Sequence, residues 1–99
     1  MSRQQRVKRM FSERIKELRI QNQMSQRQLA AVLNIDTATY CKIEKGERNA
    51  RREQVEAIAQ ILQTDKNELV TLWLADKVCR LIKNENNATQ ILKVAQKTL

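Results

Sequence analysis

The sequence predicts an all-α domain of five to six helices, and three observations support this class. Among its 99 residues there is one Gly and no Pro, so few positions oppose a helix. Apolar residues recur three and four apart, as on amphipathic helices, and no stretch alternates as a strand does. This length suits one domain, which we divide into an arm (1–10), a core (11–63) and C-terminal helices (64–99).

The composition excludes most kinds of enzyme. The chain has no His and two Cys, so neither a histidine acid/base site nor a four-ligand Cys/His zinc site can form. We therefore expect a non-enzyme without metal or cofactor. Two isolated cysteines, with no long apolar run, predict a cytoplasmic protein that does not contact a membrane.

The excess positive charge lies in the first half of the chain. Residues 1–52 hold 13 Lys and Arg against 5 Asp and Glu, whereas residues 53–99 hold 6 of each. Basic side chains neutralise phosphates and supply most non-specific affinity for nucleic acid. We therefore expect a nucleic-acid partner for the basic half and a packing role for the neutral half, with solubility as the alternative reason for the charge.

The first helix is predicted to follow a basic arm. Residues 1–9 carry four basic side chains and are read as a frayed arm, with an extra helical turn as the alternative. Apolar residues then recur at helical spacing from Phe11 to Leu18, which predicts a helix over about 12–22 with Ser12 as its cap.

Two short capped helices are predicted next. Ser25 and Gln28 form a capping-box pattern at the start of a helix that begins at Gln26 and ends at Asn34, a residue that tolerates positive φ. Asp36 is the expected cap of the following helix, which ends at Gly46.

Three further helices complete the prediction. The fourth has its apolar stripe from Val55 to Leu62 and an uncertain start, for which Asn49 is a candidate cap. Asp65 and Glu68 form a second capping-box pattern that opens a long helix to about residue 84. A sixth helix covers the end of the chain.

The two short helices have the apolar spacing of a helix-turn-helix. The core positions are Leu29, Leu33, Ile35, Tyr40 and Ile43, with the small Ala30 where the helices cross. Through residues 24–30 (MSQRQLA) and 43–48 (IEKGER), the sequence resembles the Cro and lambda-type repressor family, which includes the xenobiotic-response-element-like regulators. It departs from the family at Asn34, where Gly is usual, and at Arg51, where a Ser or Thr cap is common.

The resemblance implies a lambda-repressor-like fold and double-stranded DNA as partner, with the third helix in the major groove. The base-contact candidates it implies are Thr37, Ala38, Thr39, Cys41 and Lys42. The phosphate-contact candidates are Gln26, Arg27, Lys45, Arg48, Asn49, Arg51 and Arg52. For the two threonines the alternative is an ordinary place in the first helical turn; for Lys42 it is a phosphate contact or a solvated side chain.

The same resemblance pairs Arg19 with Glu44 in a structural salt bridge between the first and third helices. Tyr40 is expected in the core with its hydroxyl at the edge, and Cys41 is expected to be a packing or groove-edge residue rather than a redox sensor. A disulfide between Cys41 and Cys79 is not expected.

The predicted fifth helix carries an apolar arc, from Leu69 to Ile82, that is wider than a surface helix needs to pack on one domain. The sixth helix could cover it within the chain, or two copies could pair through Leu69, Leu72, Trp73, Ile91 and Leu92. We expect a homodimer that binds a roughly palindromic operator. The protein would then be a sequence-specific transcriptional regulator of the repressor type. The alternative is an antitoxin-type protein whose C-terminal half inhibits a partner protein.

Overall fold

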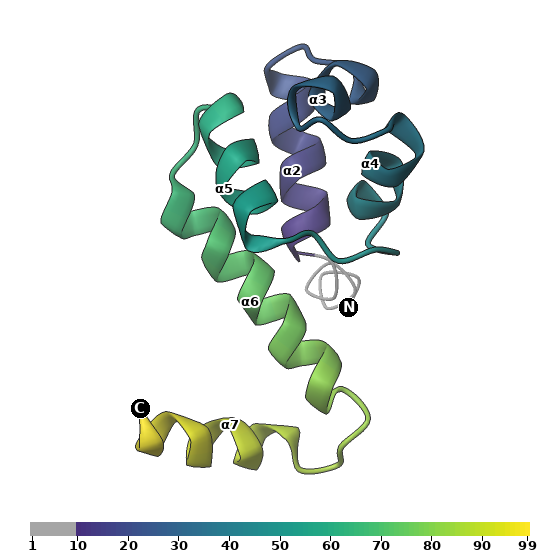
Figure 1. Ribbon diagram of the computed structural model, residues 1–99. Helices are drawn as coiled ribbons and strands as arrows, with labels where there is room; N and C mark the ends of the chain where they lie inside the picture. Colours follow the sequence, from purple (N-terminus) through teal and green to yellow (C-terminus); the bar gives the residue numbers. More distant parts are fainter. Residues whose placement is uncertain (1–9) are drawn as a thin grey trace.

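The computed structural model describes residues 10–99 and contains six helices and no strand within that range, which confirms the all-α class (Figure 1). The helices are α2 (Met10–Gln21), α3 (Gln26–Val32), α4 (Thr37–Glu44), α5 (Arg52–Ile61), α6 (Lys66–Ile82) and α7 (Ala88–Thr98). The predicted basic arm lies outside the described residues, except for Met10, which belongs to α2.

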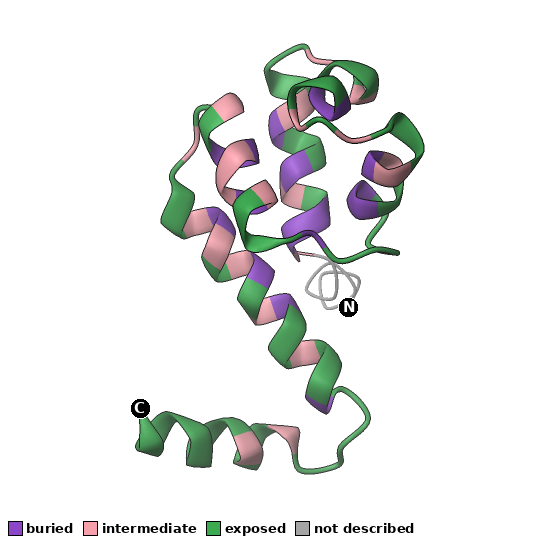
Figure 2. Ribbon diagram, viewed as in Figure 1, coloured by how far each residue is buried: buried purple, intermediate pink, exposed green. Residues whose placement is uncertain are grey.

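The core surrounds α2, which lies between α5 and α4 in Figure 1. Its buried stripe of Phe11, Ile15 and Leu18 repeats every three or four residues, so all three side chains lie on one face. The other helices add Leu29, Tyr40, Ile43, Val55, Ile58 and Leu69 to the same cluster. Figure 2 shows these buried positions on the inward faces of the five helices α2 to α6.

Four helices end in the same way, with a left-handed residue that reverses the chain. These residues are Gln23, Asn34, Gly46 and Gln63, with φ between 56° and 80°. After each, the next backbone N–H returns to a carbonyl of the last helical turn, as from Ile35 to Ala30 at 3.1 Å. The predicted exits at Asn34 and Gly46 are confirmed, whereas the two at glutamine carried no sequence signal.

The starts of α3 and α4 are also as predicted. The Ser25 hydroxyl accepts from the Gln28 N–H at 3.0 Å, and the Gln28 side chain accepts from the Ser25 N–H at 2.8 Å. The Asp36 carboxylate accepts from the Thr39 N–H at 2.7 Å. These caps satisfy backbone N–H donors that a helix start leaves unpaired, and they set where α3 and α4 begin.

Two other predicted caps are wrong, and the predicted capping box of α6 forms only in part. Ser12 lies buried inside α2 and does not cap it, and Asp76 of α6 accepts from the Phe11 N–H at 2.9 Å instead. Asn49 does not cap α5, whose N-cap is Arg51. Asp65 is the N-cap of α6 as predicted and accepts from the Asn67 N–H, but Glu68 does not complete the capping box because its carboxylate pairs with Arg14. α6 ends at Ile82, close to the predicted end near residue 84.

The C-terminal helices differ in how they pack. The first half of α6 lies against α2 and α5, and there Leu69 and Trp73 are buried in the core. Both were predicted as dimer-interface residues, and the structure corrects this because their surface is already covered within one chain. By contrast, α7 has no buried residue and does not fold back over the core (Figure 2).

Among residues 10–99, no helix is long and apolar enough to span a membrane.

Candidate nucleic-acid interface

A buried ion pair fixes α4 against α2. The Arg19 guanidinium donates to both Glu44 carboxylate oxygens, at 2.8 and 2.9 Å, and a third N–H donates to the Met24 carbonyl at 2.7 Å. The Glu44 side chain is only 3% exposed, so this planar, two-bond contact replaces the water that its charge has lost. The predicted pairing of Arg19 with Glu44 is confirmed.

Two more side chains on the same carboxylate complete the attachment. The Tyr40 hydroxyl donates to Glu44 at 2.6 Å and the Gln26 amide donates to it at 3.0 Å. Tyr40 is fully buried, which confirms it as a core residue, but its hydroxyl lies inside the core with Glu44 and not at the edge as predicted. Gln26 and Tyr40 belong to α3 and α4, so one carboxylate joins three helices.

These contacts shift the protonation equilibria in opposite directions. Burial of Glu44 would raise the pKa of its carboxyl, but hydrogen bonds from Arg19, Tyr40 and Gln26 outweigh that effect and lower it. Burial raises the pKa of Tyr40, and the adjacent carboxylate adds to the rise. Glu44 is therefore ionised and Tyr40 neutral near pH 7.

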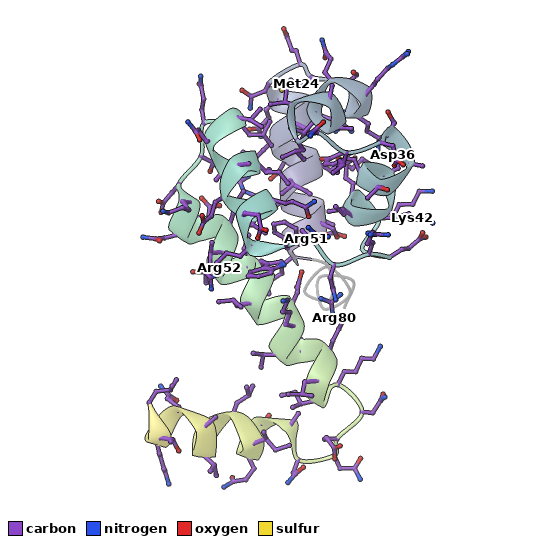
Figure 3. All side chains as sticks on the ribbon, viewed as in Figure 1. Met24, Asp36, Lys42, Arg51, Arg52 and Arg80 are labelled. Atoms are coloured by element: carbon purple, nitrogen blue, oxygen red, sulfur yellow. The ribbon has the colours of Figure 1, made fainter. Side chains whose placement is uncertain are left out.

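The remaining face of α4 points away from the core. Its residues Thr37, Ala38 and Lys42 are exposed, while Thr39 and Cys41 are half-buried beside them. Figure 3 shows Lys42 and Asp36 on the outer side of α4. The five base-contact candidates therefore include every side chain of α4 that the core does not take up.

Asp36 is the one carboxylate at the start of this face. Its hydrogen bond with Thr39 lowers the pKa of the carboxyl, and the nearby charges of Arg48 and Lys42 lower it further. The acid is thus committed to capping α4 and its charge is offset by two cations. The outer face of α4 keeps a positive balance.

Exposed basic and polar residues flank α4 on both sides. Arg27 lies on α3, and Lys45, Arg48, Asn49 and Arg51 lie on or next to the loop from α4 to α5. All five are exposed. They precede and follow α4 in the chain, and exposed side chains of these types are the ones that bind phosphates beside a groove-binding helix.

Two phosphate-contact candidates already have partners within the chain. The Gln26 amide is held between Glu44 and the Cys41 thiol, which donates to its oxygen at 3.2 Å. The Arg52 guanidinium lies 4.0 Å from Glu56 and 5.6 Å from the centre of the Trp73 ring. Figure 3 shows Arg52 beside α6, apart from Lys42 on α4.

The role of Gln26 in joining α3 to α4 was missed in the sequence. Its place at the start of a helix suggested a phosphate contact, whereas its side chain bonds inward. The only sequence signal is the spacing of 15 residues to Cys41 and 18 to Glu44, which has no meaning without the turn between the helices. The two cysteines, Cys41 and Cys79, are free thiols.

The fold and the arrangement of α3 and α4 define a helix-turn-helix DNA-binding domain. Residues 15–69 match the family model of the helix-turn-helix, and the chain belongs to this Cro/C1-type family of DNA-binding transcription regulators. Families of this kind are typically non-enzymatic. Comparison with the curated proteins and with the solved structures found no significant match.

Proposed function

We propose that this protein is a sequence-specific transcriptional repressor that binds a roughly palindromic operator as a homodimer, with α4 of each copy in the major groove. The observation that carries the proposal is the division of α4 into two faces. Tyr40, Ile43 and Glu44 are buried, and Tyr40 is bonded to Glu44, while Thr37, Ala38 and Lys42 on the other face are exposed and can meet base edges.

The side chains on the outer face of α4 suit base recognition of moderate strength. The Ala38 methyl complements a thymine methyl, the Thr37 hydroxyl donates or accepts, and Lys42 donates to guanine O6 and N7. Lysine is a point charge and lacks the two-pronged geometry of arginine. We expect the operator to be read by several modest contacts rather than by one dominant pair.

The homodimer is supported by apolar surface that one chain leaves uncovered. On α6, Leu74, Val78 and Leu81 follow each other at helical spacing and are exposed, Leu81 to 80%. On α7, the half-buried Ile91 and the exposed Leu92 are adjacent on a helix that has no buried residue. A second copy related by two-fold symmetry would cover both stripes and present two α4 helices to DNA.

A second candidate function rests on the same uncovered surface. The protein would be an antitoxin-type regulator whose α6 and α7 bind and inhibit a different protein, while the helix-turn-helix binds its own promoter. The distinction lies in the self-association of the pure chain. A stable dimer favours the first function, and a monomer that binds DNA only weakly favours the second.

Assignment to the xenobiotic-response-element-like subtype and to the cytoplasm belongs to the same proposal. It is supported by the residues 24–30 and 43–48 that carry the resemblance, and by the two free thiols.

The test of the proposed function is selection of the purified protein on a random duplex DNA pool at near-physiological salt, followed by sequencing. We expect an enriched inverted repeat. Recovery of DNA without a shared sequence would contradict sequence-specific regulation, because it would leave only electrostatic attraction to the backbone.

A further inference from the structure

The α4–α5 loop and the second half of α6 enclose a cavity of about 270 Å³. Its floor is apolar, formed by Phe11, Ile43, Ala50 and Trp73. Its rim is basic and comes from two separate segments: Arg48 with Asn49 from the loop, and Arg80 of α6 with Lys83, the C-cap of that helix. The loop residues are phosphate-contact candidates, whereas the α6 residues lie in the half of the chain whose net charge is zero.

The residues of α6 that face the loop form one helical stripe. Asp76, Cys79, Arg80 and Lys83 follow one another at spacings of three, one and three residues, and all four line the cavity. The exposed apolar stripe of Leu74, Val78 and Leu81 lies about half a turn away by the same spacing. Because the two stripes lie on opposite sides of the helix, Arg80 and Lys83 stay accessible when a partner covers the apolar stripe.

None of the three rim cations is held in an ion pair within the described chain. The side chains of Arg48, Arg80 and Lys83 form no ion pair or hydrogen bond within residues 10–99. Two carboxylates lie near them without pairing, since the charge of Arg48 lowers the pKa of Asp36 and that of Arg80 opposes the rise in the pKa of Asp76 that burial causes. The one carboxylate in the cavity wall, Asp76, is 8% exposed and holds the start of α2 through the Phe11 N–H. Three cations against one committed acid leave a concave site with a positive balance.

We infer that Arg80 and Lys83 extend the DNA interface from the α4–α5 loop onto α6, and that together with Arg48 they bind phosphates of the DNA backbone. The inference rests on the proposed function, because it takes the loop to lie along a DNA strand. Figure 3 shows Arg80 projecting from α6 on the side of the loop. Each phosphate that a cation neutralises releases bound counterions, so this extension adds affinity that depends on salt and not on base sequence.

The test compares two double variants of equal charge. Arg80→Gln with Lys83→Gln removes both α6 cations from the rim, and glutamine keeps the helix propensity. Lys66→Gln with Lys93→Gln removes two exposed lysines that do not line the cavity. For each protein, the affinity for the selected operator is measured across a salt series.

We expect the rim variant to lower the slope of log affinity against log salt by about 1.8, or about 0.9 for each single variant, with the base preference unchanged. The control variant should keep the wild-type slope. Arg80→Lys should also keep it, because lysine retains the positive charge at this position. Equal slopes for wild type and rim variant, with a wild type that still selects its operator, would overturn the inference and leave the proposed function standing. Failure of the wild type to select any operator would overturn the proposed function instead. The salt series would then be repeated on random duplex DNA, where equal slopes for the wild type and the rim variant would overturn the phosphate contacts of Arg80 and Lys83.

A free anion is the other source of a phosphate group for this site. Inorganic phosphate is therefore titrated into both proteins while their thermal unfolding is followed. Stabilisation of the wild type but not of the rim variant, with equal salt slopes on DNA, would overturn the DNA assignment in favour of a small anion.

Discussion

Trp73 of α6 donates its indole N–H to the carbonyl of Ala50 at 3.1 Å, and this bond ties α6 to the segment that follows α4. The ring is buried to 7% exposure, with Lys77 lying 3.9 Å from its centre. The helix that we expect at the dimer interface is thus bonded directly to the segment that we expect along the DNA.

Replacement of Trp73 by Phe should destabilise the fold. The variant keeps an aromatic ring but leaves the buried Ala50 carbonyl without its donor, which costs about 1–3 kcal/mol. Trp73→Ala also opens a cavity and should cost about 3–5 kcal/mol. Urea unfolding measures both values, and two variants as stable as the wild type would show that the bond does not contribute.

Glu44→Gln should cost about 3–5 kcal/mol at pH 7, because it leaves the charge of Arg19 buried without its counter-ion. The pKa of Glu44 is lowered in the folded protein, so its stabilisation is present above the ordinary value of about 4.3 and is lost as the pH falls through the folded value. The difference from wild type in urea unfolding should therefore shrink between pH 7 and acid pH. Asp36, whose pKa is also lowered, is common to both proteins and cancels. A difference that stays constant with pH would contradict this account of Glu44.

Lys42→Ala should relax the preference at one base position by about 1–3 kcal/mol, because Lys42 is the only long donor on the outer face of α4. The measurement is competition between the selected operator and its single-base variants. Lys66→Ala, which removes an exposed lysine at the start of α6, should leave the preference unchanged. An equal loss of affinity on every sequence would identify Lys42 as a phosphate contact instead.

Arg51 and Arg52 should differ although they are adjacent. Arg51 has an exposed side chain without a partner among residues 10–99, so Arg51→Gln should lower the salt slope of DNA binding by about 0.9. Arg52 faces Glu56 and Trp73, so Arg52→Gln should leave the slope near the wild-type value. Equal decreases for both variants would show that Arg52 leaves its partners when DNA binds.

Leu81→Glu should weaken dimerisation at least tenfold in sedimentation equilibrium, since it would bury a charge in the proposed interface. Because Leu81 is exposed in the single chain, the fold should be unaffected, as circular dichroism would show. Ile20→Glu is a matched control, since Ile20 is an exposed apolar residue of α2 at 56%. An unchanged dimer in the Leu81 variant would place the interface elsewhere or favour the antitoxin-type function.

Local features of this fold could be predicted from the sequence because their determinants are close along the chain. The Ser25 and Asp36 caps act on an N–H three residues away, and Asn34 ends α3 through its own backbone. By contrast, the Asp76 carboxylate that accepts from the Phe11 N–H at the start of α2 lies 65 residues further along the chain. Nothing in the sequence near Ser12 therefore indicates that Asp76 accepts a hydrogen bond from this helix start.

The candidate site was predictable to the same extent. The outer face of α4 follows from helical periodicity once its buried positions are assigned. The inward turn of Gln26 and the separation of Arg52 from α4 depend on how whole helices pack. The same holds for the gathering of Arg80 and Lys83 beside Arg48, because counting charges by half of the chain assigned α6 to a neutral segment.

The most direct test of the account is hydroxyl-radical footprinting of the wild type on its selected operator. Two α4 helices in successive major grooves should protect two symmetric half-sites whose centres lie about 34–36 Å apart, or about 10–10.5 base pairs. Protection of a single half-site, or of backbone without two-fold symmetry, would contradict a dimer that reads DNA with both recognition helices.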